Sequence, residues 1–232
     1  MRIRKLSIIV PVFNEEKTVG EVIKRLSDLV IKGIKKEVII VDDGSVDGTT
    51  ESLRKQSKSK SKDFKFIFKN KNEGKGAAIK TGLKYATGDY VIVQDADLEY
   101  HPREIKKLVR LAEKTGTSVI YGTRNRGISN RYAYPVLYWG AKPLIWMINI
   151  LYCQNLSDPE CCYKLIRRDL LDFEIEEKGF GMEVELTAKL AKKKIKILEV
   201  PIAYIPRTYT QGKKITVIDG VRAVWLAIKW AI

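Results

Sequence analysis

Short apolar runs alternate with helix-spaced apolar residues through the first half of the 232-residue chain, and this alternation limits the folds it can adopt. Runs rich in Ile and Val predict buried strands at 6–10, 37–41, 65–68, 90–94 and 118–121. Apolar residues three or four apart predict helices at 19–26, 48–53, 76–85 and 102–112, the second with Asp47 as its N-cap. Because strands that alternate with helices form βαβ units, we expect an α/β fold whose mostly parallel sheet is covered by helices on both faces.

The pattern changes after residue 131, where aromatic residues become frequent. We expect an amphipathic segment at 132–152, a strand and turn region at 158–173, a helix at 182–192, a strand at 196–200 and a last helix at 217–232. No apolar run reaches the roughly 18–20 residues needed to span a bilayer, so we expect no membrane crossing. The sequence contains no repeats and no break that marks a second domain, and we expect a single domain over residues 1–232.

The chain carries 43 Lys and Arg against 28 Asp and Glu, a formal net charge of +15. Such a surface favours an anionic partner: nucleic acid, an acidic membrane face or a phosphorylated substrate. The basic stretch 55–65 is expected to be a solvated loop. Three cysteines cannot pair evenly, and the adjacent Cys161 and Cys162 are not spaced as zinc ligands, which favours a reducing compartment. The charged start of the chain does not resemble a signal peptide, so we expect a cytoplasmic location.

Polar residues follow four of the predicted strands where each strand ends. They occupy positions 14–15 (NE), 42–43 (DD), 95–97 (DAD) and 122–124 (GTR). In open α/β sheets, ligands bind at the carboxyl ends of the strands. Asp95 and Asp97 carry the hard oxygen ligands that suit Mg²⁺ or Mn²⁺. Because four carboxylates at one edge repel one another without a cation or hydrogen-bond donors, we expect a metal–nucleotide site there.

Motifs spread along the chain resemble those of known glycosyltransferases. Residues 11–15 (PVFNE), 41–45 (VDDGS), 72–76 (NEGKG), 95–97 (DAD) and 122–124 (GTR) resemble, in order, the motifs of family 2 inverting glycosyltransferases with a GT-A fold. Residues 163–164 (YK), 180–183 (FGME) and 207–213 (RTYTQGK) are similar to motifs of the polyprenyl- or dolichyl-phosphate mannose synthases within that family. The resemblance implies a GT-A, Rossmann-like sheet in which residues 1–127 bind the nucleotide sugar. Residues 128–232 would form the acceptor side, with amphipathic interfacial helices.

The resemblance also implies roles for individual residues. The expected nucleotide pocket comprises Pro11, Phe13, Glu15, Val41 and Asp43, with Asp43 near the base and Phe13 where the family usually has Tyr. The expected ribose and diphosphate contacts are Asp95, Ala96 and Asp97, and Arg124 is expected at the donor.

The metal and the phosphate groups have expected partners too. Asp97 is the main expected ligand of Mg²⁺ or Mn²⁺, with Glu99 and Asp95 as further ligands. Arg207 and Lys213 are expected to hold phosphate groups in the closed complex, and with Asp97 they form the expected catalytic set.

The activity that the resemblance implies is the metal-dependent, inverting transfer of a hexose to a polyprenyl or dolichyl phosphate at the cytoplasmic face of a membrane. Such a hexosyltransferase is similar to dolichyl-phosphate β-D-mannosyltransferases, and mannose from GDP-mannose is the expected donor. The alternative is a UDP-glucose-dependent enzyme, or one with an acceptor that is not a lipid. We expect peripheral membrane contact and no nucleic-acid binding, and a separate membrane partner stays open.

The residue types fit an acceptor that is already an anion. A phosphate monoester has a second pKa of about 6, so it has little proton to lose and needs no strong general base. An alcohol acceptor would need a positioned carboxylate. Glu183 and Glu185 are candidates, although we expect them to position the acceptor side or to face solvent. His101, at a predicted helix start, is expected to be structural or solvated, and Lys75 is a further candidate for substrate contact.

Two other classes of protein compete with this interpretation. A nucleic-acid-binding protein would explain the charge, but the positive residues are dispersed and the acidic sheet edge would repel phosphates without a metal. A non-catalytic scaffold would be expected to lose a metal carboxylate, whereas Asp95 and Asp97 are both present.

Aromatic residues are frequent between 134 and 152, and Trp225 and Trp230 lie in the last predicted helix. These rings are expected either in the core or at a membrane interface, where Trp and Tyr settle at headgroup depth. The spacing in that helix places Val221, Val224, Trp225 and Ile228 on one side and Arg222 and Lys229 on the other.

Overall fold

A computed structural model describes residues 2–59, 61–126, 135–207 and 217–231 of the chain. Within these residues one sheet is formed by β1 (Lys5–Val12), β2 (Lys35–Asp42), β3 (Phe64–Phe68), β4 (Tyr90–Val93), β5 (Val119–Thr123), β6 (Lys164–Arg167) and β7 (Leu198–Pro201). The order across the sheet is β3-β2-β1-β4-β6-β5-β7. Neighbouring strands are parallel except that β6 is antiparallel to both β4 and β5. The predicted α/β fold with a mostly parallel sheet is confirmed.

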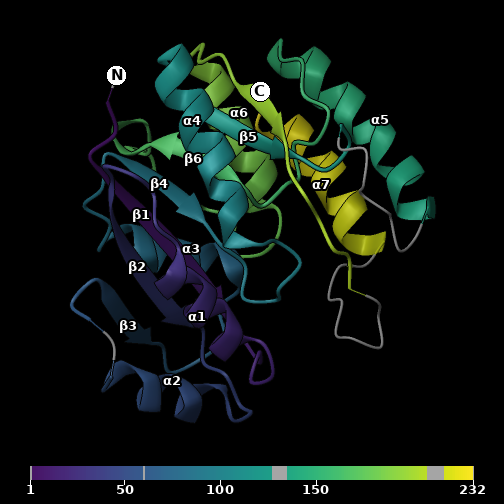
Figure 1. The fold of residues 1–232 in the computed structure, drawn as a ribbon. Helices are drawn as coiled ribbons and strands as arrows, with labels where there is room; N and C mark the ends of the chain where they lie inside the picture. The colour runs from purple at the N-terminus through teal and green to yellow at the C-terminus, as the bar shows by residue number, and fades with distance from the viewer. Residues whose placement is uncertain (1, 60, 127–134, 208–216, 232) are drawn as a thin grey trace.

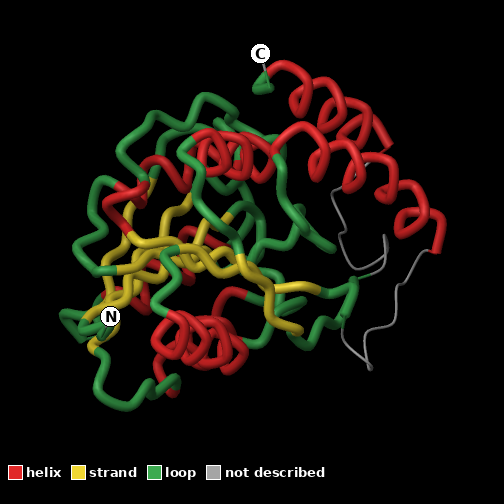
Figure 2. Tube along the Cα trace, turned by 90° about the horizontal axis from the view of Figure 1, so that it is seen from above, coloured by secondary structure: helices red, strands yellow, loops and turns green. Residues whose placement is uncertain are grey.

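Helices lie on both sides of the sheet, as Figure 2 shows. The first half contains α1 (Val19–Asp28), α2 (Thr49–Ser57), α3 (Lys75–Leu83), the 3₁₀ turn η1 (Pro102–Glu104) and α4 (Ile105–Thr115). The second half contains α5 (Pro135–Tyr152), the 3₁₀ turn η2 (Arg168–Leu170), α6 (Met182–Lys192) and α7 (Val217–Lys229). Figure 1 shows β3 and α2 at one side of the molecule and α5 and α7 at the opposite side.

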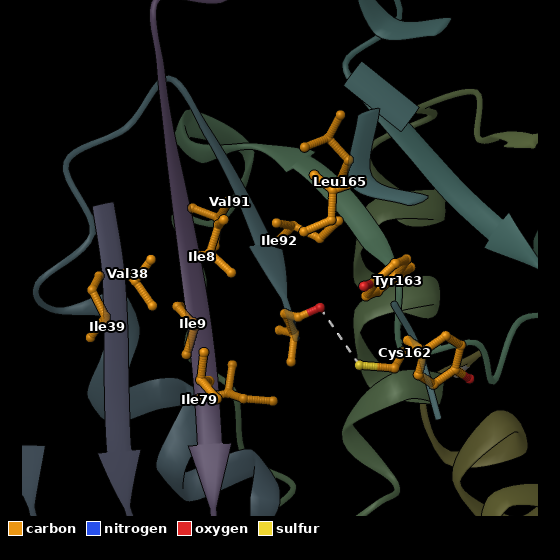
Figure 3. Close-up of a cluster of buried hydrophobic side chains, with 14 of the residues drawn as sticks. Ile8, Ile9, Val38, Ile39, Ile79, Val91, Ile92, Cys162, Tyr163 and Leu165 are labelled. Carbon is orange, nitrogen blue, oxygen red and sulfur yellow. Dashed lines mark hydrogen bonds between the residues drawn. The ribbon is translucent and has the colours of Figure 1, made fainter. Parts of the chain in front are cut away.

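The central strands are buried on both faces, which explains their continuous apolar sequences. Ile8, Ile39 and Ile92 come from β1, β2 and β4, and all three are fully buried. Figure 3 shows Ile8, Ile39 and Ile92 among the buried side chains of these strands, with Cys162 and Tyr163 beside the end of β4. A rigid core therefore holds the carboxyl ends of β1, β2 and β4 next to one another.

Two helix starts differ in detail from the prediction. The N-cap of α2 is Gly48 and not Asp47. The Asp47 carboxylate instead accepts a hydrogen bond from the backbone N–H of Thr49 at 2.9 Å, so it still serves the first turn. A 3₁₀ turn precedes α4, and Nδ1 of His101 accepts from the backbone N–H of Arg103 at 3.2 Å. His101 thus has the structural role expected of it.

Helices α5 and α7 lie side by side in both views (Figures 1 and 2), although their sequences are 65 residues apart from the end of one to the start of the other. The buried residues they contribute are Leu144, Ile148, Tyr152, Ala223, Leu226 and Ala227, which pack with α6. The hydroxyl of Tyr152 donates to the backbone carbonyl of Ala227 at 2.6 Å. Helix α5 continues through Pro143.

The outer surface of this helix pair is apolar. The exposed residues are Trp139, Trp146, Ile150 and Leu151 of α5 and Val221, Val224, Trp225 and Ile228 of α7. On α7 these are the residues that the sequence placed on one apolar side, and it is the smaller Ala-rich side that packs inward. We call these eight residues the outer apolar face. In the described part of the chain, none of the helices has both the length and the apolar character that crossing a bilayer requires.

Candidate functional site

The loops after β1 and β2 are joined by hydrogen bonds from their own side chains. Asn14 follows β1 with a φ of 52°, and its Oδ1 accepts from the backbone N–H of Val46 at 2.9 Å. The backbone N–H of Asn14 donates to Oγ of Ser45 at 3.0 Å. At the end of β2, Asp42 is buried and accepts from the backbone N–H of Ser45 and the hydroxyl of Thr50. The motifs at 11–15 and 41–45 therefore form one rigid edge.

Asp43 joins this edge to the glycine-rich turn before α3. Its carboxylate is buried and pairs with the ammonium of Lys69. Its Oδ2 accepts from the backbone N–H groups of Glu73 at 3.1 Å and Gly74 at 2.7 Å. The motifs at 41–45 and 72–76 are thus held together by one carboxylate. The expected place of Asp43 near a nucleotide base stays a prediction.

Asp95, at the end of β4, is held by a cation from the interior. The ammonium of Lys75 lies 2.9 Å from Oδ1 and 3.1 Å from Oδ2 of Asp95, and 3.5 Å from Oε1 of Glu183. Burial disfavours the charged ammonium, but the carboxylates of Asp95 and Glu183 raise the pKa of Lys75 well above its ordinary value. Glu183 is paired on its other side with the buried ammonium of Lys164.

Asp97 pairs with Arg207, which follows β7 in the second half of the chain. Nη2 of Arg207 lies 3.2 Å from Oδ2 of Asp97, and Nη1 lies 3.1 Å from Oε2 of Glu15. Burial, together with the neighbouring carboxylates of Asp95 and Glu99, raises the pKa of Asp97 to about 7 in spite of Arg207. Nε of Arg207 is buried and has no hydrogen-bond partner within the described residues. The structure therefore brings together three of the residues singled out in the sequence: Glu15, Asp97 and Arg207.

Glu99 anchors the segment that carries Arg207. Its Oε1 accepts from the backbone N–H of Arg207 at 2.7 Å, and its Oε2 accepts from the hydroxyl of Tyr204 at 3.1 Å. The backbone carbonyl of Glu99 accepts from the N–H of Ile205 at 3.0 Å. Glu99 was expected as a metal ligand, and in this structure its carboxylate holds a loop.

The three expected metal ligands do not form a ready cluster. Across residues 2–59, 61–126, 135–207 and 217–231, no three His, Cys, Asp or Glu side chains meet closely enough to hold a metal ion. The charges nevertheless suit a divalent cation. The linked carboxylates are Glu15, Asp95, Asp97, Glu99 and Glu183, and the linked cations are Lys75, Lys164 and Arg207. Two negative charges remain when all are ionised, and the neighbouring carboxylates add to the effect of burial, which is the larger cause of the raised pKa of Asp97.

Arg124 is held by a partner that sequence analysis did not identify. Its Nε and Nη2 each lie 2.7 Å from the carboxylate of Asp158, and its backbone N–H donates to the same group at 2.8 Å. Burial opposes the charge, but Asp158 raises the pKa of Arg124 well above its ordinary value. The guanidinium carbon is 5.2 Å from the ring centre of Tyr204, beside Glu99. Arg124 therefore supports the segment before Arg207, and its contact with a donor stays a prediction.

Glu183 and Glu185 do not face solvent, and that part of the prediction is wrong. Both are buried at the start of α6. Glu185 accepts from the backbone N–H groups of Glu176 and Glu177, each at 2.8 Å, and pairs with Lys189 at 2.7 Å. Glu183 lies between the ammonium groups of Lys75 and Lys164. Both carboxylates are thus engaged with donors inside the protein.

The remaining residues that the sequence singled out differ in how deeply they are buried. Pro11 and Val41 are paired across β1 and β2, with Val41 fully buried and Pro11 partly exposed. Phe13 is partly exposed at the same edge, and Ala96 is buried between the two aspartates. Lys213 lies outside the described residues. The motif at 163–164 contains Lys164, so the sequence indicated that residue. No motif in the sequence indicated Asp158 or Tyr204.

The fold is an α/β domain whose sheet carries several carboxylates at one edge. A family model described as glycosyl transferase family 2 matches residues 7–173, and the chain belongs to that family. The dolichol-phosphate mannosyltransferase of Pyrococcus furiosus is 29% identical over 232 residues, covering 97% of this chain and 64% of that protein. The undecaprenyl-phosphate 4-deoxy-4-formamido-L-arabinose transferase of Proteus mirabilis is 30% identical over 221 residues, covering 91% and 63%. The chain thus spans less than two thirds of the length of these relatives.

Solved structures share the fold. Glucosyl-3-phosphoglycerate synthase from Mycobacterium tuberculosis in complex with UDP superposes with a TM-score of 0.75 at 21% identity, covering 98% of this chain and 80% of that chain. The same enzyme in complex with Mn²⁺, UDP-glucose and phosphoglyceric acid gives a TM-score of 0.70 at 21% identity, with the same coverage. The predicted GT-A, Rossmann-like fold is confirmed.

Proposed function

We propose that this protein is an inverting glycosyltransferase that moves a hexose from a nucleotide sugar to the phosphate of a polyprenol. Mannose from GDP-mannose is the proposed donor, and UDP-glucose is the alternative. Two named relatives support the acceptor class, since one is a dolichol-phosphate and the other an undecaprenyl-phosphate transferase. We propose that residues 1–127 bind the donor and that residues 128–232 form the acceptor side.

The observation that carries the proposal is that the carboxylates of Glu183 and Glu185 are both engaged by donors inside the protein. Transfer to an alcohol requires a carboxylate within hydrogen-bond reach of the hydroxyl proton. Glu185 accepts from two backbone N–H groups and Lys189, and Glu183 is held between two ammonium groups. A phosphate monoester is an anion at neutral pH and needs no such base. The two engaged carboxylates therefore favour a phosphate acceptor.

The Asp97 edge supplies what a nucleoside diphosphate leaving group needs. A Mg²⁺ or Mn²⁺ ion held there by Asp97, with Asp95 and Glu99 as proposed further ligands, would neutralise the developing diphosphate charge. Glu15 and Asp97 orient the guanidinium of Arg207, whose buried Nε has no partner in the described chain. Arg207 would turn this donor toward an oxygen of the transferring or accepting phosphate, where an arginine forms a bidentate contact. Lys213 is proposed to assist it.

The outer apolar face supports a membrane acceptor. A contiguous exposed apolar surface of this kind marks a binding surface. Its three Trp residues, with Lys142 and Lys229 on the same helices, suit the headgroup region of a bilayer. We therefore propose peripheral attachment at the cytoplasmic face of a membrane, where the lipid phosphate is reached without a spanning helix. A separate membrane partner stays open.

Direct product analysis tests the function. The protein is incubated with Mn²⁺, a short polyprenyl phosphate and each of GDP-mannose, UDP-glucose and UDP-galactose, and the lipid fraction is identified by mass. We expect one hexose added to the polyprenyl phosphate with GDP-mannose. A product with UDP-glucose alone would correct the donor, and no glycolipid with any donor would overturn the proposal.

Vesicle binding tests the location. We expect sedimentation with vesicles that contain anionic lipid, and a reduction of roughly tenfold in the partition coefficient when Trp225 is replaced by Ala, because partial insertion of an indole contributes about 1–2 kcal/mol. Trp230→Ala is the comparison variant, since Trp230 packs against the buried cluster of α5, α6 and α7. Equal binding by wild type and Trp225→Ala would contradict the assignment of this face.

A further inference from the structure

A row of alternating charges runs from the carboxylate edge into the interior. Asp95 pairs with Lys75, Lys75 lies 3.5 Å from Glu183, and Glu183 pairs with Lys164. The four residues come from four elements: the end of β4, the start of α3, the first turn of α6 and the start of β6. The row therefore joins the carboxylate edge to the buried residues Glu183 and Lys164.

The inner members of the row are closed off from ligand. Side-chain exposure falls from 19% for Asp95 and 14% for Lys75 to 7% for Glu183 and 2% for Lys164. A cavity of about 20 Å³ lies beside Glu183 and Lys164, and it has room for about one water molecule. Glu183 and Lys164 are too buried for direct contact with a ligand in this structure, and Lys75 links them to Asp95.

The backbone around Lys75 is held as firmly as its side chain. The N–H of Gly76 donates to the carbonyl of Lys178 at 2.7 Å. A Cβ at position 76 would collide with the carbonyl of Glu177, so only glycine allows this approach. The start of α3 is thereby fixed against the segment that leads into α6, which carries Glu183. Lys75 has one well-defined position, between Asp95 and Glu183.

We propose that Glu183 is a positioning residue: held by Lys164, it holds Lys75, and Lys75 fixes the carboxylate of Asp95 for the bound nucleoside diphosphate. This inference rests on the proposed function, because it assumes that Asp95 meets the donor. It assigns Glu183 a role other than that of a general base. Groups that orient a metal-binding side chain commonly affect affinity or activity by 10- to 100-fold, and here Lys75 contacts Asp95 directly while Glu183 acts through Lys75.

Buried charges make a single substitution hard to interpret. Glu183→Gln leaves the ammonium of Lys164 buried without its carboxylate, so we expect a lower melting temperature. The double variant Glu183→Gln/Lys164→Met removes both charges and leaves no unpaired ion. We expect it to melt close to the wild-type protein. The exposed pair Lys80 and Glu174, which also joins α3 to the segment before α6, provides the matched control as Lys80→Met/Glu174→Gln.

The test is the affinity for GDP and for UDP, each with Mn²⁺, measured by calorimetry on the full chain. We expect the charge-matched Glu183→Gln/Lys164→Met variant to bind the preferred nucleotide 10- to 100-fold more weakly, and the control pair to bind as wild type. Glu183→Asp should restore part of the affinity. If the charge-matched variant melts and binds as wild type, the row is only structural and the positioning role is wrong. If the wild type binds neither nucleotide, the proposed function fails, and this role fails with it.

Discussion

Asp95 and Asp97 are separated by one residue, yet their surroundings are opposite. Asp95 is held by the ammonium of Lys75, which begins α3 in the first half of the chain. Asp97 is held from outside by Arg207, which precedes a segment outside the described residues. Burial and neighbouring carboxylates raise the pKa of Asp97 to about 7, which means that its charge is incompletely compensated. Asp95 is paired with a lysine, while Asp97, whose pKa is raised, is the carboxylate whose charge a bound cation would compensate.

This difference suggests a division of labour between the two aspartates. Asp95 has a fixed orientation before any ligand arrives, which suits recognition of a ribose or diphosphate group. Asp97 shares Arg207 with Glu15, and a cation that binds Asp97 would compete with that arginine. Arg207 would then be available for phosphate.

The largest expected effect is a difference between variants of the two aspartates in transfer activity and in melting temperature. Asp97→Asn should abolish transfer, by about 10³-fold or more, because the cation stabilises the leaving diphosphate by several kcal/mol. The metal-free variant should unfold at the same or a higher temperature at pH 8, because the charged form of Asp97 is unfavourable there. Asp95→Asn should lower the melting temperature, since it removes a partner from the buried Lys75. Lower stability for Asp97→Asn than for Asp95→Asn would contradict the comparison.

The second effect concerns Arg207. If it acts on phosphate groups after the cation has bound, Arg207→Ala should lower kcat by about 10²-fold, or ~3 kcal/mol, and leave donor affinity without acceptor much less changed. Arg207→Lys should restore only part of kcat, because one ammonium does not reproduce a bidentate contact. Steady-state kinetics and calorimetry measure the two quantities. Loss of donor affinity as large as the loss of kcat would place Arg207 in the ground-state donor site instead.

A smaller effect is the pH dependence of metal binding. The pKa of Asp97 is raised from its ordinary value near 3.8 to about 7, so the folded protein takes up a proton there as the pH falls through 7. That proton competes with the cation, and Mn²⁺ affinity should fall by roughly tenfold per pH unit below 7. The metal-free protein should in turn lose stability as the pH rises toward 7, because the folded state binds the proton more tightly than the unfolded chain does. Manganese titration followed by electron paramagnetic resonance measures the affinity, and Asp97→Asn should remove its pH dependence.

The smallest expected effect is that of a variant at Asp47, which serves as a control outside the pair Asp95 and Asp97. Asp47 accepts from the backbone N–H of Thr49 and lies before α2. Asp47→Ala should cost about 1 kcal/mol of folding free energy, as losses of helix-terminal acceptors do, with little change in kcat. Urea unfolding measures the cost. A large loss of activity would show that the loop at 45–48 belongs to the donor site.

The sequence predicted the first half of the molecule better than the second half, for physical reasons. Strands β1, β2 and β4 are buried on both faces, so their apolar runs and the carboxylates that follow are local signals. The pairing of Lys75 with Glu183 joins residues 108 positions apart, and that of Arg124 with Asp158 joins residues 34 apart. No local pattern specifies such pairs, since each depends on how β6 and α6 pack against the sheet.

Helix α7 also shows that a local sequence pattern does not specify which surfaces pack together. Its periodicity correctly separated Val221, Val224, Trp225 and Ile228 from the charged residues, but periodicity does not decide which side packs inward. The Ala-rich side packs because small residues allow close approach to α5 and α6, and the large apolar side chains remain outside. The predicted N-cap at Asp47 differed from the structure by one residue, the usual uncertainty at helix ends.

The central claim is that the acceptor is a phosphate and that no protein carboxylate serves as its base. The most direct test compares one short polyprenol with its phosphate monoester as acceptors, at equal concentration, with the preferred nucleotide sugar and Mn²⁺. The account predicts hexose transfer to the phosphate and no measurable transfer to the alcohol. It also predicts that the rate on the phosphate falls as the pH is lowered through about 6, where the monoester gains a proton. Efficient transfer to the free alcohol would contradict the account.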